Sequence, residues 1–546
     1  MTGSIARIAA PAALGVGLVT GGIATAMSLQ PTISPRSGKQ QAIVTGVSAV
    51  GGMAVGAGVT KLATKLGARI PGGPVALIGA MALGGIGVAA MTNRGAGTHA
   101  KAVSALGSAG TVLGAVGAAG LAVVGSRYLG PTAGKVALAA GVGGLAWKMH
   151  SQSDASPDAP TRTVAAAKIA AKRVAHRPID ASVPPVLATE SGGRRSMFSM
   201  DEIGKEGRHF VEGVVPGAKI RKVMGGCAVD PIRVYAPLGS ADTAQGRVNL
   251  AMHEAERLGT FNGSRKQIIV ATTTGSGFVD PPSIQAAELM ERGRTATIAL
   301  QYANKPSVLS TGKVPLGGQT TKLMLEALHK RIAKMPPSQR PEVVMFGESL
   351  GAWAQQDAIK GTGTAELKKL GVSRSLWVGS PNGSTYAQEQ KAGEINGSVR
   401  RFDRIEDVDK LTPKQRAQMK YVMLTHEDDP VAQMDPKSIG YQRPQWLPAH
   451  GTRPNGVPQA QKYVPGVSLA QGIVDLLNGT NPLPGKFDAH SHDYRADLPD
   501  FVRVAYGHDT PGTADYVNNR QVGAITSELV QMEKNRAALM QRDPSW

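Results

Sequence analysis

Long apolar runs without any charged residue dominate the first 150 positions of the chain. They occupy residues 8–29, 41–60, 70–93 and 102–126. Each run holds 20 to 25 residues, enough at about 1.5 Å per residue to cross a hydrocarbon core of roughly 30 Å as a helix. A fifth run, 136–147, is shorter and would have to extend back towards Tyr128, with Lys135 reaching the membrane surface. The pattern predicts a transmembrane α-helical bundle of four or five spans over residues 1–150.

The same runs have two other interpretations. They are rich in Ala and Gly, so a soluble small-residue segment is one alternative, although that much exposed apolar surface would aggregate in water. Arg7 followed by the run 8–29 also has the polarity of a signal peptide. That run is longer than a usual signal-peptide core and three similar runs follow it. A membrane domain made of several spans is therefore the favoured interpretation.

A different pattern begins after a segment at 151–204 that is rich in Pro, Ser and Asp and that we interpret as a linker. From residue 205 to 546, short apolar runs alternate with amphipathic stretches. The runs that predict strands are 232–236, 267–272, 295–301, 343–346, 375–379 and 421–425. The stretches that predict helices are 243–258, 283–292, 322–333, 350–360 and 498–505. Such alternation predicts an α/β fold, a mostly parallel sheet with helices on both faces, whose active site lies at the carboxyl ends of the strands.

Charge is distributed unevenly between these two halves. The net charge is +20, and residues 1–150 supply eleven Lys or Arg and no Asp or Glu, which leaves 20 − 11 = +9 for the rest. The first eleven cations lie between apolar runs, where they suit lipid headgroups. Aromatic residues make up only 4% of the chain, so the stacking platforms of a nucleic-acid surface are not indicated. The single cysteine, Cys227, excludes intrachain disulfides and Cys-rich metal sites.

The strongest chemical motif follows the predicted strand at 343–346. It reads Gly347-Glu348-Ser349-Leu350-Gly351 and runs directly into a predicted helix. This is the G-x-S-x-G nucleophile elbow, in which a serine sits on a tight strand-to-helix turn between small residues. It is the one such match in the chain. Ser349 is therefore the predicted nucleophile, and the backbone N–H of Leu350 at the start of the helix is a predicted oxyanion donor.

An activated serine needs a base and an acid, which follow it along the chain in proteins with this elbow. The predicted strand at 421–425 leads into His426-Glu427-Asp428-Asp429-Pro430. A carboxylate just past this strand is placed to hold a histidine. Asp429 is the first choice, Asp428 the second and Glu427 the third, and the alternative role for Asp429 is a turn or helix-capping residue.

Four histidines lie beyond Asp429, and two of them occupy one polar loop. The loop reads Ala489-His490-Ser491-His492-Asp493. His492 is the predicted base, His490 is its close rival, and a plain surface histidine is the alternative for either. The same cluster could be interpreted as a metal site, but further ligands would have to come from far away in the sequence, so no metal is predicted.

A second oxyanion donor is expected in the loop after an earlier strand. The strand at 267–272 ends in Thr273-Thr274-Gly275-Ser276-Gly277, whose glycines let backbone approach a ligand closely. Thr274 and Gly275 are the predicted donors. The glycines lack the Lys-Ser/Thr partner of a phosphate-binding loop, and no cofactor is indicated.

These motifs together resemble the bacterial membrane-anchored α/β-hydrolase family, which combines a multi-span amino-terminal domain with a carboxyl-terminal catalytic domain. The matching segments are 207–211 (GRHFV), 231–235 (PIRVY), 273–281 (TTGSGFVDP), 301–302 (QY), 340–342 (RPE), 347–351 (GESLG), 376–379 (LWVG), 429–431 (DPV) and 492–495 (HDYR). The resemblance implies an α/β-hydrolase fold and a serine hydrolase with Ser349, Asp429 and His492 as its triad. Ser491 departs from the family pattern, because a glycine is expected before the catalytic histidine.

The expected function is that of a membrane-anchored, esterase- or lipase-like serine hydrolase. Its partners would be a lipid bilayer and an ester or lipid substrate, with no nucleic acid. The alternatives are an acyltransferase with the same residues and a non-catalytic membrane scaffold that keeps the hydrolase fold. The expected location is the cell membrane, and four spans with the amino terminus inside would leave the catalytic domain in the cytoplasm.

Overall fold

The computed structural model describes residues 21–65 apart from 23, 31 and 35, residues 177–384, residues 399–479 with short gaps between 436 and 465, and residues 485–543. The chain divides into two compact units. One comprises Met1–Pro160 and Met434–Asn481, and the other comprises Thr161–Gln433 and Pro482–Trp546. A segment from the second half of the sequence thus belongs to the same unit as the amino-terminal residues.

The larger unit is built on a seven-stranded sheet in which every neighbouring pair is parallel. The strands are β1 Ile232–Ala236, β2 Gln267–Thr272, β3 Thr295–Leu300, β4 Glu342–Glu348, β5 Val372–Val378, β6 Val399–Phe402 and β7 Tyr421–Leu424. Their order across the sheet is β1-β3-β2-β4-β5-β7-β6. The strands that precede the predicted nucleophile and acid, β4 and β7, are therefore both neighbours of β5.

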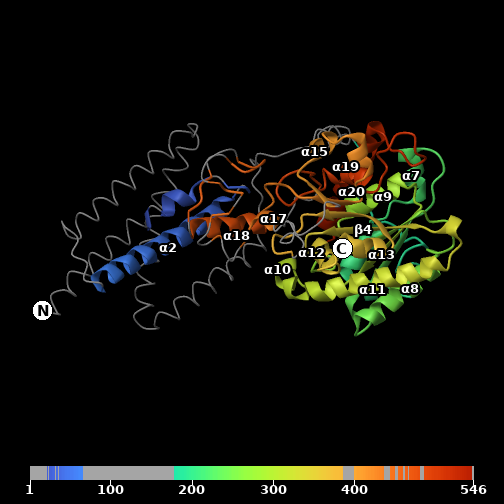
Figure 1. Cartoon of the computed structure of the whole chain (residues 1–546), viewed down its shortest axis with the longest axis horizontal. Coiled ribbons are helices and arrows are strands. Elements are labelled where there is room, and N and C mark those ends of the chain that lie inside the picture. The colour runs from blue at the N-terminus through green and yellow to red at the C-terminus, as the bar shows by residue number, and fades with distance from the viewer. Residues whose placement is uncertain are drawn as a thin grey trace. The chain divides into compact units, whose positions relative to one another are not determined.

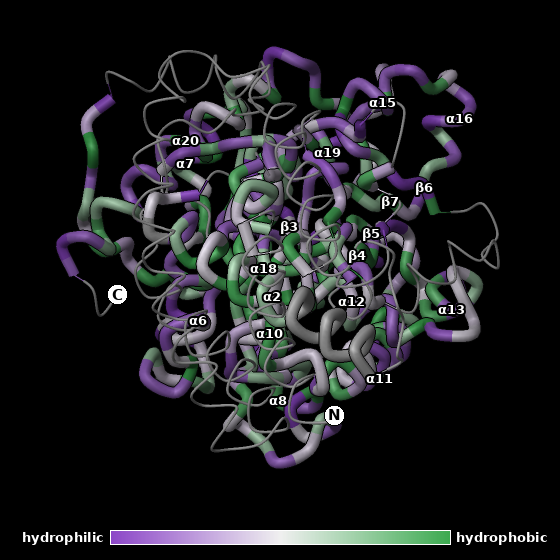
Figure 2. Tube along the Cα trace, turned by 90° about the vertical axis from the view of Figure 1, so that its left-hand side faces the viewer, coloured by the Kyte–Doolittle hydropathy of each residue, from purple (hydrophilic) through white to green (hydrophobic). Residues whose placement is uncertain are grey.

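Helices cover both faces of this sheet (Figure 1). One face packs against α6 Met200–Glu212, α7 Gly217–Met224, α9 Pro281–Met290, α19 Leu498–Ala505 and α20 Asn519–Arg542. The other packs against α8 Ala244–Leu258, α11 Val314–Ala333, α12 Leu350–Asp357 and α13 Thr364–Lys369. Successive residues of a strand point to opposite faces of the sheet, as Ile268 and Ile269 of β2 do. Both faces are apolar because helices shield each of them from water, and green, hydrophobic stretches of tube lie around the labels β3 and β4 in Figure 2.

The predicted α/β architecture is confirmed, and all six predicted strands are present. The structure adds β6, whose sequence Val-Arg-Arg-Phe gives no apolar run because it is an edge strand with only its ends buried. Helix α11 begins at Val314, eight positions before the predicted start. Helix α6 was not predicted, and it crosses the linker boundary placed at residue 204. Its start is fixed by a capping box between Ser199 and Glu202.

The smaller unit pairs α2, Gly38–Lys65, with α18, Val467–Gly479 (Figure 1). The Gln40 side chain donates to Asn478 Oδ1 at 2.6 Å, and the Ser34 N–H donates to Asp475 Oδ1 at 3.3 Å. Side chains from both stretches of sequence share one apolar cluster, made of Ile33, Met434, Ile439, Trp446, Leu447 and Val457. Described residues of 434–479, a segment between the predicted acid and the predicted base along the chain, thus contact residues 33–40.

The predicted second span, 41–60, lies within helix α2. Among the residues that the structure describes, no helix is both long enough and apolar enough to cross a membrane. The predicted runs at 70–93, 102–126 and 136–147 lie outside the described residues, as does most of the run at 8–29.

Candidate active site

Ser349 stands at the sharp turn between β4 and α12. Its backbone has φ 52° and ψ −122°, a conformation that L-residues rarely adopt and that a surrounding structure must enforce. The turn needs both of its glycines. A Cβ on Gly347 would lie 2.8 Å from the backbone N of Ala352, and one on Gly351 would collide with the carbonyl oxygen of Thr272. The predicted nucleophile elbow is therefore present in its strained form.

Gln355 holds the helix behind this turn against three strands. Its fully buried amide donates to the carbonyl oxygens of Val270 in β2 and Phe346 in β4, at 3.1 and 2.7 Å. In return, its carbonyl oxygen accepts the indole N–H of Trp377 in β5, at 2.8 Å. A buried amide with its donors and acceptor satisfied fixes the position of α12. The hydrogen bonds of Gln355 thus fix the start of α12 and, with it, the position of Ser349.

His492 and Asp429 form a buried pair. The Nδ1 atom of His492 lies 2.7 Å from Asp429 Oδ2, and the Tyr494 hydroxyl donates to the same oxygen at 2.6 Å. The other oxygen, Asp429 Oδ1, accepts the N–H of Val431 at 2.7 Å. A carboxylate that accepts from Nδ1–H leaves the lone pair of a neutral imidazole on Nε2. This is the tautomer that can remove a proton from a serine hydroxyl.

The register of the sheet brings this pair to the nucleophile. Glu348 of β4 is paired with Val378 of β5, so the residues that follow them, Ser349 and Gly379, come directly after the ends of adjacent strands. The N–H of Ser349 donates to Val378 O at 2.8 Å. The ring of His492 packs on Gly379 so closely that a Cβ there would lie 2.6 Å from its Cε1 atom. Ser349 and His492 are both nearly buried, at 8% and 7% exposure.

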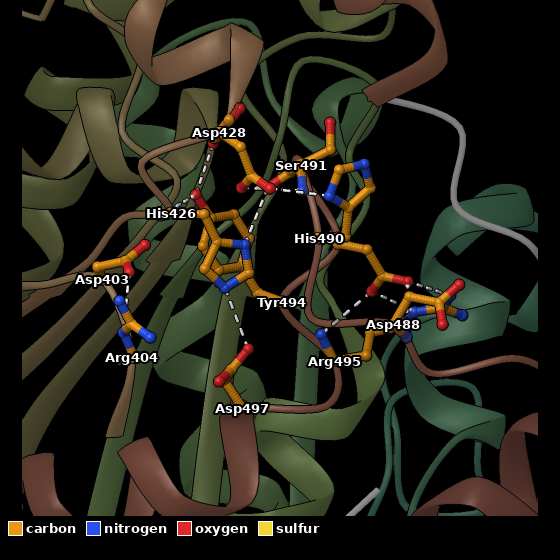
Figure 3. Close-up of polar contacts among 12 residues, drawn as sticks. Asp403, Arg404, His426, Asp428, Asp488, His490, Ser491, Tyr494, Arg495 and Asp497 are labelled. Carbon is orange, nitrogen blue, oxygen red and sulfur yellow. Dashed lines mark hydrogen bonds and ion pairs between the residues drawn. The ribbon is translucent and has the colours of Figure 1, made fainter. Parts of the chain in front are cut away.

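A second imidazole–carboxylate pair joins His490 to Asp428 (Figure 3). His490 Nδ1 is 2.8 Å from Asp428 Oδ2, and the N–H of Ser491 donates to Asp428 Oδ1 at 3.2 Å. The two candidate acids therefore hold different histidines: Asp429 holds His492, and Asp428 holds His490. The backbone N–H of Glu427, the third candidate, donates to Asp403 Oδ1 at 2.8 Å.

The backbone conformation of Ser491 explains why a glycine was expected between the two histidines. Its φ is +59°, in the left-handed region that glycine adopts without a steric penalty. This turn directs His490 and His492 to separate carboxylates. The chain keeps the conformation with a serine, whose buried hydroxyl makes no hydrogen bond with the described residues.

The third pair joins His426, just after β7, to Asp497 at the start of α19 (Figure 3). The Nε2 atom lies 3.0 Å from Asp497 Oδ2, and Nδ1 lies 2.9 Å from the carbonyl oxygen of Ser491. Burial lowers the pKa of His426, but the carboxylates of Asp497 and Asp428 outweigh burial and raise the pKa to about 9. At neutral pH this histidine is a cation that ties β7 to the loop carrying His490 and His492.

The alternative of a metal site at this loop finds no support in the arrangement of its side chains. Asp493 binds the guanidinium of Arg495 at 2.9 and 2.7 Å, and Arg495 also binds Glu533 at 2.8 Å. His490 and His492 each have their own aspartate. Within the described part of the chain, no three His, Cys, Asp or Glu side chains are grouped so that they could hold a metal ion.

The two candidate oxyanion donors of the β2 loop differ in availability. The N–H of Thr274 donates to Phe278 O at 2.8 Å, so it closes a turn of its own loop. The N–H of Gly275 makes no hydrogen bond with the residues described. The close contact of Gly351 with Thr272 places the β2 loop next to Leu350, which opens α12 and has no helical partner for its N–H. The structure therefore favours Leu350 and Gly275 over Thr274.

Glu348, next to the nucleophile, and Asp280 each have one carboxyl oxygen that is buried without a hydrogen-bond partner among the described residues. Burial raises the pKa of Glu348 well above its ordinary value, and the nearby carboxylates of Asp280 and Asp493 raise it further. Burial also raises the pKa of Asp280, to about 7. The surroundings of Glu348 therefore favour its protonated, neutral form more than water does. Protonation of Glu348 removes a negative charge beside the serine, where such a charge would oppose formation of an oxyanion.

Sequence reasoning missed three of these supporting residues. Tyr494 and Arg495 lie in the segment HDYR that contributed to the resemblance, but their roles depend on Asp429 and Glu533, which are 65 and 38 positions away. His426 was seen only as part of the strand end. No local pattern distinguishes a histidine that binds a distant aspartate from one in solvent, so these roles required the folded chain.

Comparison with known proteins gives one match. A family model described as an alpha/beta-hydrolase family matches residues 232–514, just over half of the chain. The matched region runs from β1 past α19 and contains Ser349 and all three histidine–aspartate pairs. No curated protein and no solved structure matches.

Proposed function

The chain belongs to this alpha/beta-hydrolase family, and from that membership we propose that it is a membrane-anchored serine hydrolase that cleaves ester-like substrates, lipid esters among them. A hydrolase-type function follows from the family itself. The proposal adds the triad Ser349, His492 and Asp429. The observation that carries it is the meeting, on neighbouring strand ends, of a strained serine turn and a buried imidazole–carboxylate pair.

The proposed reaction proceeds through an acyl-enzyme. Ser349 Oγ attacks the ester carbonyl carbon while His492 Nε2 takes the hydroxyl proton. The N–H groups of Leu350 and Gly275 stabilise the negative oxygen, and Asp429 stabilises the imidazolium. The tetrahedral intermediate then expels the alcohol, which receives the proton from His492. A water molecule then attacks the acyl-enzyme, with His492 again acting as the base. This step releases the carboxylic acid and restores the Ser349 hydroxyl.

A fluorophosphonate probe tests the nucleophile directly. The probe phosphonylates a serine only when a neighbouring base activates it, so the folded wild-type chain should be labelled within minutes. Ser349→Ala should abolish labelling, and Ser264→Ala, which alters an exposed serine of the same unit, should leave it unchanged. Mass spectrometry of the labelled peptide identifies the site. Labelling that persists in Ser349→Ala, or wild-type protein that stays unlabelled, would rule out Ser349 as nucleophile.

The anchoring part of the proposal is supported by the charge-free runs at 70–93 and 102–126, which are long enough to span a bilayer. We expect the full chain to stay in the membrane fraction after extraction with alkaline carbonate and to require detergent for release. A peripheral protein that binds headgroups by charge would be released by the carbonate. Release of the full chain would therefore contradict anchoring while leaving the proposed triad untouched.

A further inference from the structure

Two adjacent aliphatic side chains project into solvent beside the candidate active site. They belong to the α10 loop, residues 304–313, which follows β3 and contains the short helix α10, Ser307–Ser310. Val308 is 63% exposed and Leu309 is 60% exposed. These are the highest values for large hydrophobic side chains in the described part of the chain. Exposing two neighbouring apolar residues in water is unfavourable, which suggests that they have an apolar partner.

The α10 loop is held firmly although these two side chains are exposed. The N–H of Lys305 donates to Gly275 O at 3.1 Å, and the Ser310 hydroxyl donates to Lys305 O at 2.9 Å. Packing here is so close that a Cβ on Gly275 would lie 2.6 Å from Ser310 Cβ and 2.8 Å from Ser307 Cα. The exposure of Val308 and Leu309 is therefore a fixed feature of a loop that buttresses a proposed oxyanion donor.

The charge around these side chains has one sign. Lys305 and Lys313 flank Val308 and Leu309 and are both exposed, and neither forms an ion pair with the residues that the structure describes. No Asp or Glu occurs between Glu291 and Glu326. Apolar side chains between unopposed lysines match the interface of an anionic bilayer, where the side chains enter the headgroup region and the ammonium groups meet phosphates.

We propose that the α10 loop docks the hydrolase unit on an anionic phospholipid surface, with Val308 and Leu309 inserted and Lys305 and Lys313 on the headgroups. This docking proposal rests on the proposed function. It specifies that a lipid ester would enter the site directly from the bilayer, on the side where Gly275 lies. The area of two side chains is far too small for a stable protein–protein interface. A bilayer surface, in contrast, can bind a few apolar side chains that insert among its headgroups.

Lipid contact can be measured without any catalytic readout. The full chain, with Cys227→Ser to remove its single cysteine, would carry Leu309→Cys labelled with an environment-sensitive NBD group. Val229→Cys is the matched control, because Val229 is 45% exposed and precedes the amino end of β1, whereas the α10 loop follows the carboxyl end of the parallel neighbour β3. In phosphatidylcholine vesicles containing phosphatidylglycerol, nitroxide-labelled lipid should quench the probe at 309 at least threefold more than the probe at 229. Equal quenching at the two positions would overturn the proposal.

Activity on two kinds of substrate separates docking from catalysis. The double variant Val308→Ser/Leu309→Ser should hydrolyse a lipid ester in anionic vesicles at least tenfold more slowly than wild type, yet hydrolyse a water-soluble short-chain ester within twofold. Lys305→Glu/Lys313→Glu should remove the preference for anionic over zwitterionic vesicles. Equal losses on both substrates would mean that the loop only supports Gly275, which contradicts docking. If wild type hydrolyses no ester, the proposed function fails, and the quenching experiment still decides whether the loop meets lipid.

Discussion

His492→Gln should lower kcat on a soluble ester about 10⁴-fold, whereas His490→Gln should leave kcat within about threefold. Glutamine can keep a hydrogen bond to the aspartate but cannot take the proton of Ser349. The loss should therefore appear only where the imidazole acts as the base. His492 packs on Gly379, the neighbour of Ser349 across the strands, and its Nδ1 is fixed by Asp429. His490 is fixed by the other aspartate, Asp428.

The aspartates provide a matched second pair for this experiment. Asp429→Asn should reduce kcat by a similar factor, because an amide favours the wrong tautomer of His492. Asp428→Asn should mainly reduce thermal stability, because it alters the partner of a buried imidazole. Unfolding curves recorded with the kinetics separate the two effects. A large loss of kcat in folded His490→Gln or Asp428→Asn, with His492→Gln active, would transfer the role of base to His490.

The buried pair of His426 and Asp497 should make the free energy of unfolding depend on pH in the alkaline range. The pKa of His426 is about 9 in the folded chain, compared with about 6.5 in an unfolded chain. Because the folded pKa is the higher one, its contribution is complete below about pH 6.5 and is lost as the pH rises through 9. The full contribution is about 3 kcal/mol.

Denaturant unfolding of wild type and His426→Gln at about pH 6 and about pH 9.5 measures this contribution. Wild type should lose about 3 kcal/mol more than the variant between the two values. His508, whose pKa burial lowers to about 4, contributes equally to wild type and variant, so its effect cancels when the two proteins are compared. Parallel pH dependence in the two proteins would show that His426 is not a buried cation.

The sequence by itself determined the parts of the fold that depend on local patterns. Short apolar runs separated by amphipathic stretches predicted six strands and a parallel sheet, because burial on both faces requires continuous apolar strands. The motif at 347–351 predicted the tight turn that carries Ser349, since a strained turn of this kind requires glycines at fixed offsets. Strand β6 escaped prediction because an edge strand with two central arginines carries no such pattern.

Only the tertiary structure decided how the functional groups are paired. Asp428 and Asp429 are adjacent in sequence, and His490 and His492 are two positions apart, so from the sequence either aspartate could bind either histidine. In the folded chain, the φ of +59° at Ser491 and the register of β4, β5 and β7 assign each histidine to one aspartate. The tertiary structure also showed that the N–H of Thr274 donates to a carbonyl of its own loop, whereas that of Gly275 makes no hydrogen bond with the described residues. Local sequence specifies which segments bury apolar surface. Which polar atoms meet depends on segments some 60 or more residues apart, whose approach is fixed only when the whole sheet packs.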